Sequence, residues 1–414
     1  MGRLIRRVGP VAVPAAPAVL AALAVLAVLG GCRQRAEAVQ IQAAVTELVR
    51  QTMPAVEHAV GLKFKRQPGV EIRTRDQVRS YILHKLDEDI PPKQFGWYEA
   101  AYKHLGLVPD SLDLHRLLVA VLTEQVAGYY DPDSGALFIP SDADTAQLRV
   151  TVVSHELVHA LQDQYSPIDS VLHQLHENDR RSAGQAIFEG QATLAQIRVL
   201  MPEQDIQNLP PLWDTREAVQ MQQKQFPTFS NAPLWLRETL IFPYLAGGDF
   251  VRWFLRTHPG EQPYGALMPV STAQILHPER YAAHDVPPPI TFQPAAVGPA
   301  DYDDDLGEFE TRLVLQQALG SEEEAEALAD GWVGDRYAVY GPEGQALVWY
   351  VIWRTPAAAR AFVSALRRGW AKRVEPGRAW RIDVETVDGR PASVAADAPT
   401  GWPGWRALPR VRVR

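Results

Sequence analysis

Cysteine is nearly absent from this chain, since Cys32 is the single cysteine among 414 residues. It has no partner in the chain for a disulfide, and a zinc site made of clustered cysteines is excluded. The chain also lacks the glycine motifs of Walker-type and dinucleotide-binding proteins and the G-x-S-x-G motif of serine hydrolases. Its chemistry must therefore come from other residue types.

An excess of positive charge is also missing. The chain has 41 Lys and Arg against 49 Asp and Glu, a net charge of −8. Without Arg3, Arg6 and Arg7, which lie in an N-terminal segment that we expect to be removed, the balance is 38 against 49, or −11. A chain of this charge is not expected to bind nucleic acid or an anionic lipid surface.

Five consecutive residues, His155 to His159, supply the strongest chemical motif. They read H-E-x-x-H, a pattern in which two histidines bind zinc and the glutamate acts on the water held by the metal. Residues four apart share one face of an α-helix, so both imidazoles can reach one ion. Glu156 lies about 100° further round the helix, where it can reach that water without becoming a ligand.

The surrounding sequence predicts a helix over residues 144–164. Apolar residues recur at helical spacing, N-cap residues precede the segment, and neither proline nor glycine interrupts it. Asp163 follows His159 by four residues, so its carboxylate could orient that imidazole through the second ring nitrogen. The alternative is a pair of surface histidines with a solvated glutamate.

Catalytic zinc usually needs a third protein ligand. The extended motif H-E-x-x-H-x-x-G-x-x-H is absent, because positions 162 and 165 are Gln and Tyr. A second helix is predicted over 182–200, and Glu189 is its one acidic residue, flanked by apolar residues. A carboxylate in such surroundings is costly unless it is paired or metal-bound. Thr193, one turn later, could help to hold Glu189.

Other assignments of these carboxylates stay open. Glu189 could instead form a salt bridge on the helix surface, for example with Arg198. Glu177 and Asp179 are weaker candidates for the third ligand, because their segment is polar and is expected to be a loop.

The segments H-E-L-V-H-A-L-Q-D and F-E-G-Q-A-T together resemble the zincin superfamily of metallopeptidases, in its glutamate-liganded (gluzincin-like) branch. The resemblance covers residues 125–200. It implies a zinc cofactor held by His155, His159 and Glu189, with Glu156 as general base in peptide hydrolysis. Segments 240–251 and 271–281 are similar to a set of uncharacterised bacterial lipoproteins with predicted metallopeptidase domains.

A further hydrogen-bond donor is needed for the oxyanion of peptide hydrolysis, and gluzincins often take it from a later Tyr or His. The candidates are Tyr244, His277 and Tyr281, with preference for the last two. Each of them could instead be a packing residue. Residues 126–140 read as strand, turn and strand, and Ala136–Ile139 is the expected edge strand on which a peptide substrate pairs.

The N-terminus predicts export and lipidation. Three arginines precede an apolar run over 11–29, and Leu29-Gly30-Gly31-Cys32 resembles the bacterial lipobox, in which the cysteine is lipidated. The alternative is an uncleaved transmembrane anchor. Either reading tethers the protein to a membrane outside the cytoplasm. Arg33 after the cysteine, rather than Asp, favours the outer membrane where the cell has one.

The whole chain is expected to have an α+β fold. We predict a signal peptide over 1–31, a helical N-terminal region over 32–125 and a zincin-like region over 126–290, rich in helices with a small sheet. A small α+β domain of unknown role is expected over 300–414. Its expected elements are strands at 335–340, 346–353 and 379–387, with a helix at 356–369.

The favoured function is therefore that of a membrane-tethered zinc peptidase acting on a peptide or protein. Two alternatives remain: a zincin-like protein that binds without turnover, and a structural envelope lipoprotein that acts as a binding module. The intact Glu156 argues against the first alternative, because a protein that only binds has no need of a general base.

Overall fold

The computed structural model describes residues 39–142, 146–373 and 375–414. About 55% of the described residues are helical and the strands form small sheets, which confirms the predicted α+β class. Cys32 and the apolar run 11–29 lie outside the described residues. Within the described part of the chain, no helix is both long and apolar enough to cross a membrane.

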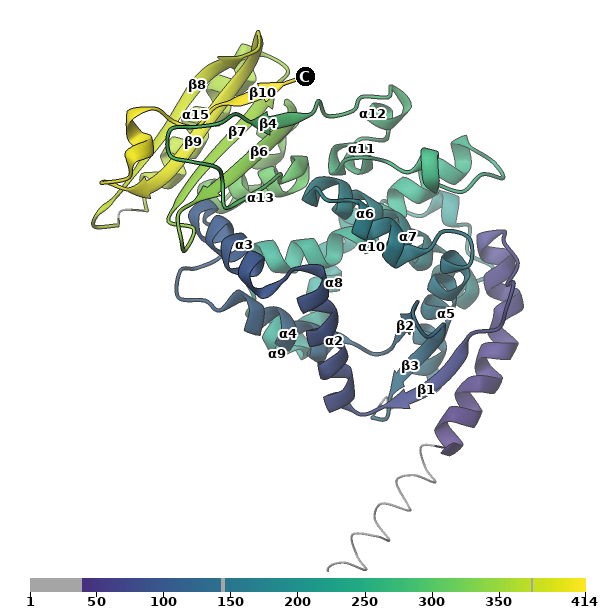
Figure 1. Cartoon of the computed structure of the whole chain (residues 1–414). Helices are drawn as coiled ribbons and strands as arrows, with labels where there is room; N and C mark the ends of the chain where they lie inside the picture. Colours follow the sequence, from purple (N-terminus) through teal and green to yellow (C-terminus); the bar gives the residue numbers. More distant parts are fainter. Residues whose placement is uncertain (1–38, 143–145, 374) are drawn as a thin grey trace, which may run out of the picture.

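The described residues begin with a helix and a small sheet, continue through a long run of helices and end in the C-terminal strands (Figure 1). A helix over residues 39–60 comes first. The later α-helices are α2 (Arg75–Asp89), α3 (Pro92–Leu105), α4 (Leu114–Gln125), α5 (Ala146–Asp163), α6 (Ile168–Gln174), α7 (Asn178–Leu200), α8 (Arg216–Gln222), α9 (Pro227–Ser230), α10 (Leu234–Thr257), α11 (Thr272–Leu276), α12 (Pro278–Ala282), α13 (Gly307–Leu319), α14 (Glu322–Ala329) and α15 (Pro356–Trp370). The strands are β1 (Gly69–Arg73), β2 (Tyr129–Asp131), β3 (Ala136–Pro140), β4 (Ile290–Phe292), β5 (Tyr302–Asp304), β6 (Trp332–Tyr340), β7 (Ala346–Trp353), β8 (Arg378–Val387), β9 (Arg390–Pro399) and β10 (Val411–Val413).

A three-stranded sheet packs against the helix of the H-E-x-x-H motif. Its order is β1-β3-β2, with β1 parallel and β2 antiparallel to β3. Apolar residues of β3, α5 and the helix over 39–60 form one buried core. The expected edge strand Ala136–Ile139 is thus wrong: this segment is the buried central strand, and β2 is the edge on the side of α5.

Two long helices, α7 and α10, form the centre of the molecule and pack closely on each other. Gly190 of α7 faces Gly247 of α10, and a Cβ atom at position 190 would lie 2.2 Å from the Gly247 carbonyl carbon. Pro243 lies inside α10 without dividing it. The absence of side chains at the crossing allows the two backbones to approach so closely.

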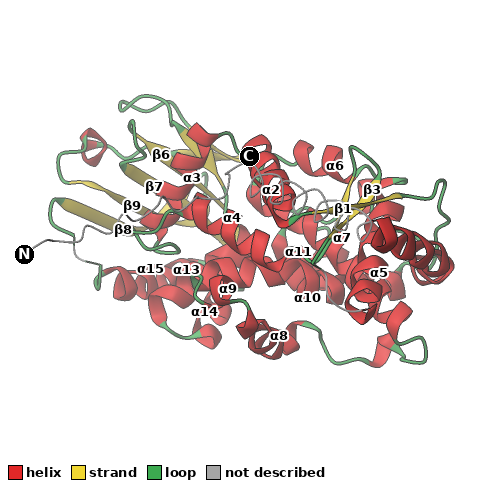
Figure 2. Cartoon of the chain, turned by 90° about the horizontal axis from the view of Figure 1, so that it is seen from below, coloured by secondary structure: helices red, strands yellow, loops and turns green. Residues whose placement is uncertain are grey.

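The C-terminal sheet has five strands in the order β5-β6-β7-β9-β8, all antiparallel. Helices α13 and α15 cover one face (Figure 2), and the two-stranded ribbon of β4 and β10 packs against the other. The predicted strands and helix of this region are all present. The sequence-based prediction missed β5, β9 and β10. Strand β9 is rich in alanine rather than in β-branched residues, and β5 lies within an acidic run that is typical of a linker.

The predicted division of the chain into regions stays a prediction, and contacts cross its boundaries. The N-terminal region is not purely helical, since it contributes β1. The Tyr102 hydroxyl of α3 donates to Glu310 Oε2 at 2.5 Å, and His104 Nδ1 lies 3.0 Å from Asp397 Oδ2. Helix α3 is therefore packed against the C-terminal region, at sequence separations of 208 and 293 residues in these two contacts.

Candidate metal centre

Two helices bring three potential metal ligands together. Helix α5 presents His155 and His159 one turn apart, and α7 presents Glu189 to both. The two Nε2 atoms lie 3.1 Å apart, and Glu189 Oε2 lies 3.1 Å from His155 Nε2 and 3.3 Å from His159 Nε2. In the described residues, this is the one group of at least three such side chains whose ligand atoms converge.

The spacing of these atoms fits a tetrahedral zinc ion. Zinc binds imidazole nitrogen and carboxylate oxygen at about 2.0–2.1 Å, so neighbouring ligand atoms at tetrahedral angles stand about 3.3 Å apart. The three observed distances agree with one face of such a tetrahedron. Two nitrogens and one oxygen with a free fourth position is also the ligand set of catalytic zinc.

A buried amide fixes the tautomer of His159. The Gln162 side chain donates from Nε2 to the Phe188 carbonyl and to Gln191 Oε1, both at 2.9 Å. Its Oε1 atom must then accept from His159 Nδ1, 2.8 Å away. A proton on Nδ1 leaves the Nε2 lone pair free, so in neutral His159 that lone pair faces the Glu189 carboxylate. The lone pair and the carboxylate repel each other unless a cation lies between them.

The amide network continues behind the histidine. Gln191 donates to Gln262 at 2.7 Å, Gln262 donates to the Val60 carbonyl at 3.0 Å, and the Tyr264 hydroxyl donates to Gln191. Gln162, Gln191 and Gln262 are thus each hydrogen-bonded within this network, which holds His159 in one orientation.

The charges at the centre favour the ionised carboxylate. Burial by itself would raise the pKa of Glu189, but the charge of His159 and hydrogen bonds from both imidazoles hold that pKa well below its ordinary value. Burial works against protonation of His159, yet the Glu189 charge outweighs it and raises the His159 pKa to about 9. A cation, whether proton or metal, is thus strongly favoured between the two groups.

Glu156 is held by backbone rather than by a side chain. Its carboxylate is 9% exposed, and Oε2 accepts a hydrogen bond from the Tyr130 amide of β2 at 2.8 Å. The other oxygen stays available for a proton. An edge strand of the small sheet therefore positions the candidate general base next to the candidate metal ligands.

Tyr244 of α10 completes the centre. Its ring stacks on His155 with centroids 5.9 Å apart, and its hydroxyl lies within reach of the Glu189 charge. The Glu189 charge raises the pKa of Tyr244 well above the ordinary value, so the phenol keeps its proton and stays a donor. The residue as a whole is 39% exposed.

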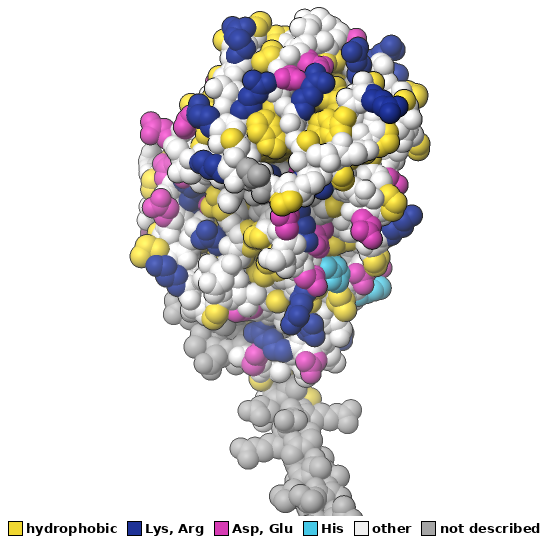
Figure 3. All heavy atoms as spheres, turned by 90° about the vertical axis from the view of Figure 1, so that its left-hand side faces the viewer, with side chains coloured by type: hydrophobic (Ala, Val, Ile, Leu, Met, Phe, Trp, Pro, Cys, Tyr) yellow, Lys and Arg dark blue, Asp and Glu magenta, His cyan; other side chains and the backbone are white. Residues whose placement is uncertain are grey.

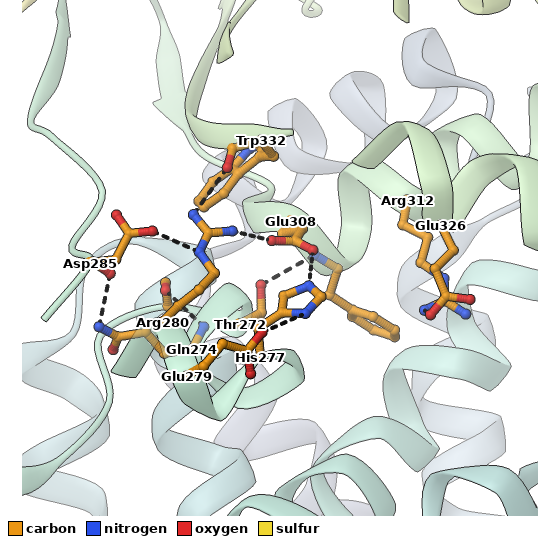
Figure 4. A network of polar contacts seen from close by, with 12 residues as sticks. Thr272, Gln274, His277, Glu279, Arg280, Asp285, Glu308, Arg312, Glu326 and Trp332 are labelled. Atoms are coloured by element: carbon orange, nitrogen blue, oxygen red, sulfur yellow. Dashed lines mark hydrogen bonds and ion pairs between the residues drawn. The ribbon is translucent and has the colours of Figure 1, made fainter. Parts of the chain in front are cut away.

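The other two candidates for the oxyanion donor must be corrected. His277 Nε2 lies 2.6 Å from Glu308 Oε1, in a network with Arg280 that joins α11 and α12 to α13 (Figure 4). The Tyr281 hydroxyl donates to the Leu267 carbonyl at 2.9 Å, and its ring packs among aromatic residues of α10. Both residues are therefore engaged in packing and ion pairing, and Tyr244 alone of the three lies at the metal ligands.

Two supporting residues were also misassigned. Asp163 accepts from the Tyr130 hydroxyl at 3.0 Å and from the Ile168 amide, so the role expected of it at His159 belongs to Gln162. Within the described part of the chain, Thr193 makes no hydrogen bond to Glu189, whose partners are the two histidines.

The alternative ligands lie elsewhere. Glu177 is the residue before α7 and lies 3.6 Å from Arg336, and Asp179 accepts from Thr272. The position of Gln162 three residues after His159 could have suggested its role, because such residues share one helix face. No sequence signal marks the backbone amide of Tyr130.

Comparison with known proteins gives little beyond this geometry. Residues 296–398 match a family described as a domain of unknown function (DUF8575). No curated protein matches the chain. One solved structure, described as "a putative hydrolase with a novel fold" from Chloroflexus aurantiacus, is 17% identical with a TM-score of 0.40, over 60% of this chain and 90% of that one.

Proposed function

We propose that this protein is a zinc-dependent peptidase of the zincin type, with His155, His159 and Glu189 as ligands. The convergence of these three donor atoms within 3.3 Å of one another is the observation that carries the proposal. Bound zinc would supply a Lewis acid that polarises the scissile carbonyl and acidifies water.

The side chains around the ligands have distinct tasks. Glu156 takes the proton of the attacking water and passes it to the leaving amine. The backbone amide of Tyr130 holds that carboxylate in place during both transfers. The Tyr244 hydroxyl, which stays protonated, donates to the oxyanion that develops on the substrate carbonyl.

The expected location supports an extracytoplasmic substrate. Lipidation at Cys32 would tether the enzyme to a membrane facing the periplasm or the exterior, and the favoured substrate is a peptide or protein of that compartment. Both statements rest on the sequence, since Cys32 precedes the described residues.

Replacing the base tests the proposal directly. Glu156→Gln keeps a group that can accept from the Tyr130 amide but cannot take a proton. We expect the variant to bind zinc as the parent does and to lose hydrolysis of a casein or peptide-library substrate by about 10²–10⁴-fold. Zinc content by elemental analysis and cleavage by mass spectrometry measure the two properties separately.

Three outcomes distinguish the alternatives. Zinc bound without cleavage by the parent protein would favour a zincin-like protein that binds without turnover. Absence of zinc from the parent at metal excess would favour the structural lipoprotein. Cleavage by Glu156→Gln at the parent rate would show that Glu156 is not the general base. Asp110→Asn, at an exposed acid distant in sequence, controls for the loss of one negative charge.

A further inference from the structure

The free edge of the C-terminal sheet is a second feature with functional potential. Strand β8 is ten residues long and, among the residues that the structure describes, pairs with β9 alone, so its other side is an edge of the sheet. Trp380 and Val384 of this strand are 38% and 42% exposed. Figure 3 views the molecule from the side on which β8 and β9 lie, and apolar side chains among Lys and Arg occupy its upper part.

The hairpin turn shows which backbone groups this edge presents. Asp388 and Gly389 join β8 to β9 with φ of 47° and 80°, the conformation of a two-residue type I′ turn. The residues that flank such a turn, Val387 and Arg390, form a hydrogen-bonded pair. Because the pattern alternates, the even-numbered residues Trp380, Ile382 and Val384 direct their N–H and C=O groups away from β9.

Charge singles out one way for this edge to pair with itself. A two-fold axis at Ile382 places Arg381 opposite Asp383 of the second copy, and Trp380 opposite Val384. An axis at position 381 would place the two Arg381 side chains opposite each other, and an axis at 383 would do the same for the two Asp383 side chains. An axis at 384 would place Asp383 opposite Glu385. Opposite charges across strands are favourable and like charges are not, so the axis at Ile382 is selected.

The selected register is complementary in shape as well. Arg381 and Asp383 face each other at a position without hydrogen bonds between the new strands, where side chains come closest. The Trp380–Val384 pair joins an aromatic and a β-branched side chain, a favourable combination across strands. We infer that β8 is a self-association edge, through which two copies of this chain join their C-terminal sheets into one continuous antiparallel sheet.

Two contacts within one copy compete with this pairing. Arg381 Nε donates to Asp383 Oδ2 of its own strand at 2.5 Å, and this ion pair must exchange for the one between copies. Arg367 of α15 crosses the edge, with Nε donating to the Ile382 carbonyl at 2.8 Å and Nη2 to Asp383 Oδ1 at 2.7 Å. It covers the carbonyl that lies on the two-fold axis. Proteins commonly protect sheet edges with such charged side chains. Arg367 therefore sets the strength of self-association, because pairing must displace it.

Sedimentation velocity of the full-length protein in non-ionic detergent, at rising protein concentration, tests the inference. We expect a reversible dimer at micromolar concentration. Arg381→Asp places like charges opposite each other and should weaken the dimer by about tenfold or more, whereas the double variant Arg381→Asp with Asp383→Arg restores the opposite pairs and the dimer. Arg367→Ala should tighten the dimer by up to about tenfold, the value of one hydrogen bond.

Arg406→Asp provides the matched control, since it changes the net charge equally at an exposed residue outside the strand. Far-UV circular dichroism confirms that each variant is folded. A protein that stays monomeric even as Arg367→Ala overturns the inference. So does a double variant that dimerises no better than Arg381→Asp. Capture of another protein by β8 without self-association would assign the edge to a different partner.

Discussion

At the scale of single residues, the sequence predicted the three candidate metal ligands that converge in the structure, but not what orients them. The H-E-x-x-H spacing fixes His155 and His159 on one helix face, so their convergence follows from helical geometry. Gln162 acts through a buried amide whose orientation depends on the Phe188 carbonyl of another helix. That partner is set by tertiary packing, which no local pattern in the sequence encodes.

Removing the Gln162 amide should weaken metal binding. Gln162→Ala leaves His159 Nδ1 without its acceptor, so the ring loses both its tautomer and its orientation. We expect zinc affinity to fall by about 10–100-fold, as for other partners of metal-bound histidines. Competition with a chromogenic chelator measures the affinity.

Gln220→Ala is the matched control for this variant, because it deletes a glutamine that donates to Glu238 at 2.8 Å outside the metal centre. Equal zinc affinity of Gln162→Ala and the parent would show that His159 needs no orienting partner.

At the scale of elements, the centre depends on how closely α7 and α10 cross. Glu189 lies directly before Gly190, and Tyr244 lies three residues before Gly247, so the glycine contact sets the distance between carboxylate and phenol. Both helices were predictable from apolar periodicity. Their crossing was not, because a glycine inside a helix can equally be an unpacked position.

Adding one methyl group at the crossing should separate the helices. In Gly190→Ala the new Cβ would meet the Gly247 backbone at 2.2 Å, and backbone cannot yield as a flexible side chain does. We expect a loss of about 1–3 kcal/mol in the free energy of unfolding, measured by urea titration.

The control is Gly96→Ala in α3, where a Cβ meets nothing within 4 Å. That variant should be neutral or more stable by up to about 1 kcal/mol, because alanine is the better helix former. If both variants lose stability equally, the effect belongs to glycine in general and not to the crossing.

At the scale of the whole molecule, buried acids join the metal-binding helix to the C-terminal region. The Asp179 amide at the start of α7 donates to Asp305 at 2.8 Å, and the Asn178 amide donates to Asp304 at 3.0 Å. Burial raises the pKa of Asp179 to about 7 and that of Glu310 to about 7. These carboxyls hold protons in the folded state at a pH where the unfolded chain, with pKa values of about 4, has lost them.

Stability should therefore fall as pH rises from about 4 to 7. In this window the folded state binds more protons than the unfolded state, so each rise in pH favours unfolding. We expect the metal-free protein to be less stable at pH 8 than at pH 5 by on the order of 1–3 kcal/mol. Asp179→Asn, which cannot ionise, should flatten part of that slope in thermal melts, whereas Asp110→Asn should not. A melting temperature that rises from pH 5 to pH 8 would contradict the raised pKa values.

Because Glu156 accepts its hydrogen bond from the backbone amide of Tyr130, most substitutions at position 130 should leave that bond in place. The amide that holds the general base belongs to position 130 whatever its side chain, and only proline lacks it. Substitutions at that position can therefore reshape the surroundings of the base while its anchor persists. Substitutions in β2 would therefore preserve the hydrogen bond to Glu156 as long as the backbone of the strand keeps its position.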